Sequence, residues 1–179
     1  MRKLGMDELN RISVEDFSAL EKLPVVCVLD NIRSQHNIGS IFRTSDAFRI
    51  TQILLCGITA TPPNREIHKS ALGATESVAW QYFQETSSAV DYLKSAGYQI
   101  IAVEQAHGSV NLSDYRVHNT DRIALVFGNE IHGVSDEIMQ LVDGCIEIPQ
   151  FGTKHSFNVS VTAGIVLYHL HTAFGVLKK

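Results

Sequence analysis

The 179-residue sequence lacks the fingerprints of several common enzyme classes. It contains neither the G-x-G-x-x-G pattern of dinucleotide-binding proteins nor the G-x-x-x-x-G-K-[ST] pattern of P-loop proteins. The G-x-S-x-G pattern of α/β-hydrolases is also missing. The sequence therefore supports neither a usual dinucleotide site, nor an ATP-binding loop, nor Ser-His-Asp hydrolysis.

Cysteine is scarce, and no metal-ligand spacing is present. The three cysteines each lie inside or beside an apolar strand pattern, which predicts buried thiols in a reducing cytoplasm. His169 and His171 would point about 200° apart on a helix, so they cannot share an ion. Four further histidines fall in separate loops, and we predict no metal site. The cysteines are Cys27, Cys56 and Cys145, and the loop histidines are His36, His68, His132 and His155.

Uninterrupted hydrophobic runs of membrane length are also missing. The amino terminus, Met1-Arg2-Lys3, leads into charged sequence, so no signal peptide is visible. The last predicted helix is strongly apolar but is interrupted by polar residues such as Asn158 and Thr162, which argues against a membrane span. We expect a cytoplasmic protein.

Charge is distributed unevenly along the chain. The formal net charge is −4. Residues 31–70 contain five basic and two acidic side chains, which gives a net charge of +3. The rest of the chain carries −7. A basic face on an acidic protein is compatible with RNA binding, and equally with an ordinary solvated surface. The five candidate RNA-binding residues are Arg33, Arg43, Arg49, Arg65 and Lys69.

Six short apolar runs alternate with helical patterns, which predicts an α/β fold with a mostly parallel sheet of about six strands. We expect a short helical extension over residues 1–23 and a single domain over residues 24–179. The predicted strands are 25–29, 53–56, 78–83, 98–103, 123–127 and 145–148. The predicted helices are one or two within 6–22, then 37–48, a short one before Ala71, 86–96, 135–141 and 158–177.

The last predicted helix is apolar around most of its girth. One sheet face would cover only one stripe of it. The sequence therefore predicts that the remainder packs against a second copy of the chain, in a homodimer.

Three polar motifs follow predicted strands. In the first, Asn37 can cap a helix, Gly39 permits close approach to the backbone, and Arg43 lies about 1.7 turns from Asn37. This pattern fits a guanidinium that engages phosphate or a reacting hydroxyl, and also a capped helix whose arginine extends into solvent. The second motif is Gly128-x-Glu130-x-x-Gly133, which an ordinary loop with an exposed glutamate would also produce.

The third motif is Ser156-Phe157-Asn158, at the start of the last predicted helix. Serine and asparagine are favoured helix N-caps, and capping does not exclude catalysis. Because ligands bind beyond the carboxyl ends of strands in α/β proteins, the loops after two of the strands suggest one shared site.

In this order, the three motifs resemble the SpoU (TrmH-like) branch of the SPOUT RNA methyltransferases. The resemblance covers roughly residues 25–175. It rests on Asn37-x-Gly39-x-x-x-Arg43, on Phe127-Gly128-Asn129-Glu130-x-x-Gly133, and on Ile148-Pro149 followed by Ser156-Phe157-Asn158-Val159-Ser160.

The resemblance implies a C-terminal trefoil knot, bound S-adenosylmethionine, an obligate dimer and methyl transfer to a ribose 2′-hydroxyl of structured RNA. The small size of the chain favours tRNA over rRNA. A knotted protein that binds RNA or cofactor without transferring a methyl group is the alternative. The implied catalytic residues are Arg43, Asn37, Glu130, Ser156 and Asn158. The implied cofactor-binding residues are Phe127, Gly128, Asn129, Gly133, Ile148, Pro149, Phe157 and Asn158.

Overall fold

The computed structural model describes residues 1–5, 8, 12–118, 121–154 and 156–175. Its strands are β1 (Leu23–Asp30), β2 (Ile50–Cys56), β3 (Trp80–Phe83), β4 (Gln99–Val103), β5 (Val110–Asn111), β6 (Ile123–Phe127) and β7 (Gly144–Glu147). Its helices are α1 (Val14–Ala19), α2 (Gln35–Ala47), α3 (Arg65–Ala71), α4 (Ala74–Ser77), α5 (Thr86–Ser95), α6 (Asp136–Met139) and α7 (Val159–Phe174).

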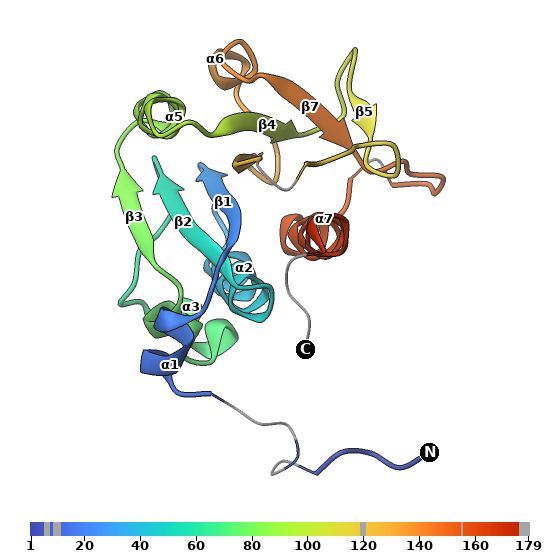
Figure 1. The fold of residues 1–179 in the computed structure, drawn as a ribbon. Coiled ribbons are helices and arrows are strands. Elements are labelled where there is room, and N and C mark those ends of the chain that lie inside the picture. Colours follow the sequence, from blue (N-terminus) through green and yellow to red (C-terminus); the bar gives the residue numbers. More distant parts are fainter. Residues whose placement is uncertain (6–7, 9–11, 119–120, 155, 176–179) are drawn as a thin grey trace.

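The strands form one sheet in the order β3-β2-β1-β6-β4-β7-β5, and every pairing is parallel (Figure 1). The predicted α/β fold with a parallel sheet is therefore confirmed. The sheet has one more strand than predicted, because the two-residue β5 pairs with β7 at the edge. Both β5 residues are exposed, so no apolar pattern marks them. The trefoil knot stays a prediction.

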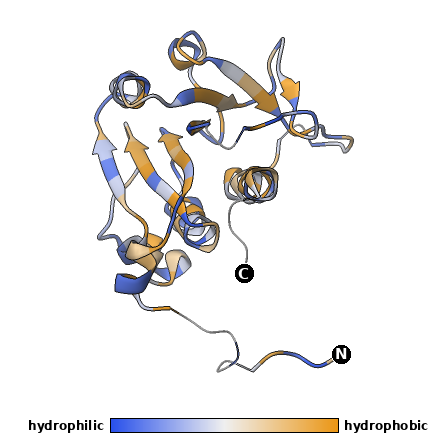
Figure 2. Ribbon diagram, in the orientation of Figure 1, coloured by the Kyte–Doolittle hydropathy of each residue, from blue (hydrophilic) through white to orange (hydrophobic). Residues whose placement is uncertain are grey.

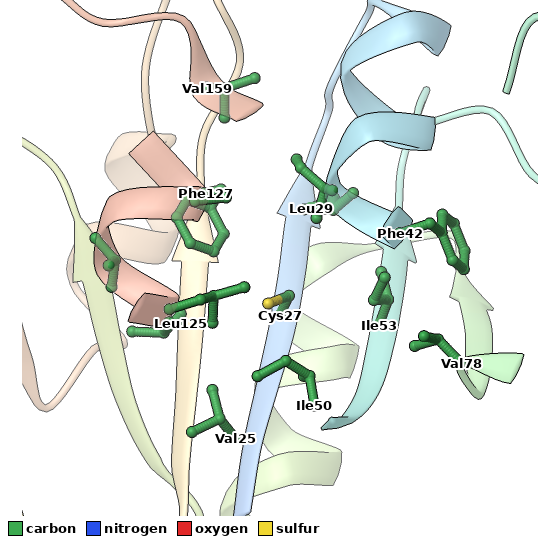
Figure 3. Close-up of a cluster of buried hydrophobic side chains, with 14 of the residues drawn as sticks. Val25, Cys27, Leu29, Phe42, Ile50, Ile53, Val78, Leu125, Phe127 and Val159 are labelled. Atoms are coloured by element: carbon green, nitrogen blue, oxygen red, sulfur yellow. The ribbon is translucent and has the colours of Figure 1, made fainter. Parts of the chain in front are cut away.

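Helices cover both faces of the sheet, and alternate residues of the central strands reach one layer or the other. Val25, Cys27 and Leu29 of β1 belong to a buried cluster that includes side chains of α2, α3 and α7. Figure 3 shows this cluster, in which Phe42 of α2 lies over the sheet. The intervening β1 residues pack in a second cluster with α5 and α6. The runs 25–29 of β1 and 53–56 of β2 are accordingly apolar, and most of β1 and the second half of β2 are orange in Figure 2.

Helix α2 begins two residues before its predicted start. Its N-cap is Ser34, whose hydroxyl accepts a hydrogen bond from the Asn37 backbone N–H at 3.3 Å. The prediction that Asn37 caps this helix is therefore wrong. Both residue types cap well, and a tertiary contact of the Asn37 side chain, described below, decides between them.

Gly39 permits a close approach, but the approaching group is another helix. A Cβ atom at Gly39 would lie 2.1 Å from Ser70 Oγ and 2.3 Å from the Ile67 carbonyl oxygen of α3. Residue 39 must therefore be small for α3 to pack on α2. The structure gives Gly39 a packing role.

The cysteines are free thiols, and two of them are fully buried. Burial raises the pKa of Cys27 and of Cys56 to about 12, so both thiols stay protonated at neutral pH. Cys145 is only partly buried. In the part of the chain that the structure describes, no helix is long and apolar enough to cross a membrane.

Both chain ends carry a helix that packs on the domain. Helix α1 contacts α4 and buries Phe17, and Ser13 is its N-cap. Part of the predicted 6–22 helical segment lies outside the described residues, and the division at residue 24 stays a prediction. Helix α7 begins at its predicted cap, Asn158, whose side chain accepts from the Ser160 N–H. Residues 176–177 of the predicted helix also lie outside the described residues.

Candidate active site

Four adjacent strands, β1, β6, β4 and β7, have their carboxyl ends on the same side of the sheet. We call this side its carboxyl edge. Residues at or one position before the carboxyl ends of these strands stand in one row, because Leu29 pairs with Phe127, Phe127 with Val103, and Val103 with Ile146. Parallel strands bring the loops that follow them to this edge. A cleft of about 790 Å³ lies there, within the range of small-molecule sites. We call it the edge cleft. It is lined by residues 103–106, 127–134, 136, 139, 147, 148, 150, 156–159 and 162.

The Glu130 carboxylate joins the loop after β6 to the start of α2. One carboxylate oxygen accepts the Arg33 backbone N–H at 2.9 Å, and the other accepts the Ser34 N–H at 3.0 Å. The second oxygen also accepts the Asn37 side-chain N–H at 3.0 Å. An anion is stabilised at this position because unpaired N–H groups and the helix dipole point toward it.

A chain of amides continues from Glu130 to α7. The Asn37 side-chain oxygen accepts a hydrogen bond from the Asn158 side chain at 3.0 Å. The Asn158 oxygen accepts from the Ser160 hydroxyl at 2.6 Å and from the Ser160 N–H. Three segments that are distant in sequence are thereby fixed against one another, and we call this set of residues, Glu130, Asn37, Asn158 and Ser160, the polar chain.

These contacts determine the protonation state of Glu130. Partial burial raises its pKa, but the hydrogen bonds from Arg33, Asn37 and Ser34 outweigh that effect, and the net pKa lies below the ordinary value. Glu130 is therefore ionised at neutral pH and accepts three hydrogen bonds. In this arrangement it orients neighbouring groups and is poorly suited to act as a general base.

This pKa shift predicts a pH-dependent contribution to stability. A carboxyl group whose pKa is lower in the folded state stabilises the fold above its unfolded pKa, and this stabilisation is lost as pH falls through the folded pKa. We expect Glu130→Gln to lower the free energy of unfolding by about 1 kcal/mol at neutral pH, allowing for solvent screening. Urea unfolding of both proteins should show this difference shrinking as pH falls below about 4. A difference that is constant across this range would contradict the account.

The loop from Gly128 to Gly133 is closed by hydrogen bonds of its own backbone. Asn129 and Gly133 exchange both backbone hydrogen bonds, at 2.9 and 2.8 Å, and the Asn129 side chain donates to the Asn31 carbonyl oxygen at 2.7 Å. Gly133 has a φ angle of +69°. A Cβ atom at Gly128 would lie 2.0 Å from the Val134 nitrogen, so only glycine fits there.

The structure brings together most of the predicted cofactor-binding residues. Seven of the eight line the edge cleft, the exception being Pro149. Pro149 instead lines a separate groove of about 390 Å³ beside α7, with Leu112, Ile165 and Tyr168. The seven lining residues are Phe127, Gly128, Asn129, Gly133, Ile148, Phe157 and Asn158.

The predicted catalytic residues occupy three different positions. Glu130, Ser156 and Asn158 line the edge cleft, and Asn37 lies behind it in the polar chain. Arg43 is exposed, does not line the cleft, and has no hydrogen bond or ion pair with another described residue. Six residues of helix place it about 120° around α2 from Asn37. Arg43 therefore faces away from the cleft of its own chain.

The five predicted RNA-binding residues are dispersed. Arg33 directly precedes Ser34, the N-cap of α2, and Arg65 is the first residue of α3. Arg49 follows the far end of α2, where its carbonyl oxygen accepts the Leu23 N–H at the opposite edge. Lys69 forms an exposed ion pair with Glu66 at 2.7 Å. The single basic face therefore divides into separate positions, and its contact with RNA stays a prediction.

Sequence reasoning missed Glu104, which lines the cleft directly after β4. Its carboxylate accepts the Val134 N–H at 3.1 Å and the Gln105 N–H at 2.8 Å. A Cβ atom at Gly133 would lie 2.2 Å from this carboxylate. Its position immediately after a buried apolar run was a signal that could have identified it.

Comparison with known proteins agrees with this geometry. The profile of the SpoU rRNA Methylase family matches residues 24–168. The chain is 35% identical over 148 residues to a tRNA (guanosine(18)-2'-O)-methyltransferase of Aquifex aeolicus, covering 80% of this chain and 67% of the relative. It is 33% identical over 159 residues to the 23S rRNA (guanosine-2'-O-)-methyltransferase RlmB of Neisseria meningitidis serogroup B, covering 88% and 62%.

A solved structure shares the fold. The AdoMet-bound rRNA methyltransferase of Sinorhizobium meliloti superposes with a TM-score of 0.79 at 26% identity, covering 94% of this chain and 62% of that one. The chain thus spans about three fifths to two thirds of the length of these proteins. The predicted resemblance is confirmed: this chain belongs to the SpoU rRNA methylase family.

Proposed function

We propose that this protein transfers the methyl group of S-adenosylmethionine to a ribose 2′-hydroxyl of structured RNA. The observation that carries the proposal is the polar chain, which borders the edge cleft through Glu130 and Asn158, in a chain of the SpoU family. The two relatives described above are both named as 2'-O-methyltransferases of RNA, one of tRNA and one of rRNA. The family and the site therefore support the same chemistry.

The edge cleft fits the cofactor in size and in its donor groups. Its volume of about 790 Å³ lies within the range of small-molecule sites, and its glycines let backbone N–H and C=O groups line it. Loops at Gly128, Ile148 and Phe157 would hold the cofactor. When bound, the sulfonium supplies an activated methyl group. The solved structure from Sinorhizobium meliloti is named as AdoMet-bound, which supports this assignment.

The residues of this chain then have to align the hydroxyl and assist loss of its proton. Alignment alone can lower the activation barrier of such a reaction by a large part. Ser156 and Asn158 line the cleft and can hydrogen-bond the ribose, while Glu130 and Asn37 fix the orientation of Asn158. A guanidinium is a planar donor and a poor base, so we assign Arg43 to position the ribose and a neighbouring phosphate.

Arg43 would complete the cleft of a second copy. Helix α7 leaves a stripe of apolar side chains exposed, with Val161 at 50%, Ile165 at 37% and Tyr168 at 62% exposure. Their spacing places them on one face, next to the apolar groove that contains Pro149. We therefore propose that a second copy covers this stripe.

The dimer has a direct test. Sedimentation velocity at micromolar concentration should show the mass of two chains. Ile165→Glu, which places a charge in the middle of the stripe, should shift the protein toward monomer. A monomeric wild-type protein would remove both the dimer and the assignment of Arg43 to a partner's cleft.

Within this function we favour tRNA as the substrate, in the cytoplasm, and a C-terminal trefoil knot as in the SPOUT fold. Transfer of labelled methyl groups to separated tRNA and rRNA, from cells that lack the protein, tests the function and the substrate together. Label in tRNA is the expected result, and label only in rRNA would retain the activity but reverse the preference. Cofactor binding without label in either fraction would favour the alternative, a non-catalytic binding protein.

A further inference from the structure

Phe151 is the most exposed aromatic side chain of the described residues, at 96% exposure. It lies in the loop between β7 and α7, which projects from the domain at the right of Figure 1. Leaving such a side chain in water forgoes the favourable burial of its apolar surface. A ligand that covers it would provide this burial.

The position of Phe151 ties it to the edge cleft. Its neighbour Gln150 lines the cleft. Because the two residues are consecutive, their Cα atoms are about 3.8 Å apart. Ser156, at the other end of the loop, lines the cleft as well. Phe151 therefore stands on a loop whose two ends border the predicted reaction site.

The loop around Phe151 is polar and carries positive charge. Gly152, Thr153 and Lys154 are all exposed, and no acidic residue occurs between positions 148 and 158. Lys154 has no ion pair or hydrogen bond with a described residue. An exposed aromatic ring with a neighbouring lysine matches the stacking surface and phosphate contact of single-stranded nucleic-acid sites.

From this placement we propose that Phe151 is the platform on which an unstacked base of the substrate RNA stacks, with Lys154 at the adjoining phosphate. The inference rests on the proposed function. We expect a ribose that reaches Ser156 and Asn158 to come from a nucleotide outside a regular helix. Proteins that read RNA sequence do so mainly at bases that are splayed out of loops and ends. The base of that nucleotide, or of its neighbour, then needs a surface at the mouth of the cleft, and the Phe151 ring provides one.

A second copy of the chain is a weaker occupant for this ring. Phe151 does not line the apolar groove beside α7, which contains Ile165 and Tyr168 of the exposed stripe. The cores of protein interfaces are contiguous and depleted in charge, whereas Phe151 is flanked by glycine, threonine and lysine. The surroundings therefore favour RNA.

The test measures RNA binding, without turnover, by fluorescence anisotropy of end-labelled tRNA from cells lacking the protein. Phe151→Ala and Phe151→Leu should both weaken binding about tenfold, whereas Phe151→Trp should retain it. Cofactor affinity should be unchanged in all three variants. Tyr92→Ala removes an exposed aromatic ring from α5, in the other helical layer, and should have no effect. Lys154→Ala should reduce the slope of log affinity against log salt by about 1.

Three results would overturn the proposal: wild-type affinity in Phe151→Ala, full retention by Phe151→Leu, or a shift of Phe151→Ala toward monomer in sedimentation. Absence of RNA binding by the wild-type protein would overturn it as well. Failure of the proposed function would look different, because RNA would then bind through Phe151 with no methyl transferred. Failure of this inference alone would leave methyl transfer intact in Phe151→Ala.

Discussion

Replacing Arg43 by alanine is expected to reduce methyl transfer at least about 100-fold while the dissociation constant for S-adenosylmethionine stays within a few fold. The physical reason is its position. Arg43 is exposed on α2 and does not line the edge cleft of its own chain, so cofactor contacts do not depend on it. Single-turnover rates and calorimetric titration of the cofactor measure the two quantities separately. Equal loss of both would contradict the role assigned to Arg43.

Two comparisons sharpen this result. Arg43→Lys keeps the charge but loses the planar fork of donors, so we expect it to recover little activity. Lys94→Ala, which removes an exposed basic side chain from α5 in the other helical layer, serves as the matched control and should leave cofactor binding and transfer nearly unchanged.

Mixing inactive variants tests whether Arg43 acts across the dimer. A dimer of one Arg43→Ala chain and one Gly128→Ala chain has one site with an intact cleft and an intact partner arginine. Random exchange of chains should then restore about one quarter of wild-type activity, because half of the dimers are mixed and each has one good site. No recovery after exchange would place Arg43 at the cleft of its own chain.

Replacing Gly128 by alanine is expected to weaken cofactor binding and to destabilise the fold. The added methyl group would lie 2.0 Å from the Val134 nitrogen and 2.1 Å from the Gly133 carbonyl carbon. These are backbone atoms of the loop that lines the cleft, so the loop itself must move. We expect an unfolding free energy lower by about 1–3 kcal/mol and a cofactor affinity lower by at least about tenfold.

Gly152→Ala is the matched control for this substitution. Gly152 lies in the β7–α7 loop, and, its chain neighbours aside, no atom of the described residues would lie within 4 Å of a Cβ atom there. Gly152→Ala should keep a near-wild-type melting temperature and cofactor affinity, whereas Gly128→Ala should lower both. A Gly128→Ala protein that melts and binds like the wild type would contradict the described closure of the loop.

The central part of the sheet could be predicted from sequence because its strands β1 and β6 are buried on both faces. Runs such as 25–29 and 123–127 are apolar throughout, and the structure extends or keeps them. Strand β5 gave no such signal, since its two residues are exposed and pair only through the backbone. The order of the strands depends on contacts between distant segments, which local patterns do not contain.

The candidate site could be predicted in outline from the motifs, but its connections could not. Asn37 was expected to cap its own helix, yet its side chain bridges Glu130 and Asn158, residues 93 and 121 positions away. Gly39 was expected to admit a close approach, and the approaching group proved to be α3. Glu104 belongs to no motif, and only the adjacency of β4 and β6 brings it to Val134.

The most direct test of the proposed activity is to locate the methyl group on the product. RNA labelled by the wild-type protein should be digested to nucleosides and separated, with Arg43→Ala as the control. We predict that all label appears in a nucleoside methylated at its ribose 2′-oxygen and that none appears with the variant. Label on a base, or equal label with Arg43→Ala, would contradict the account.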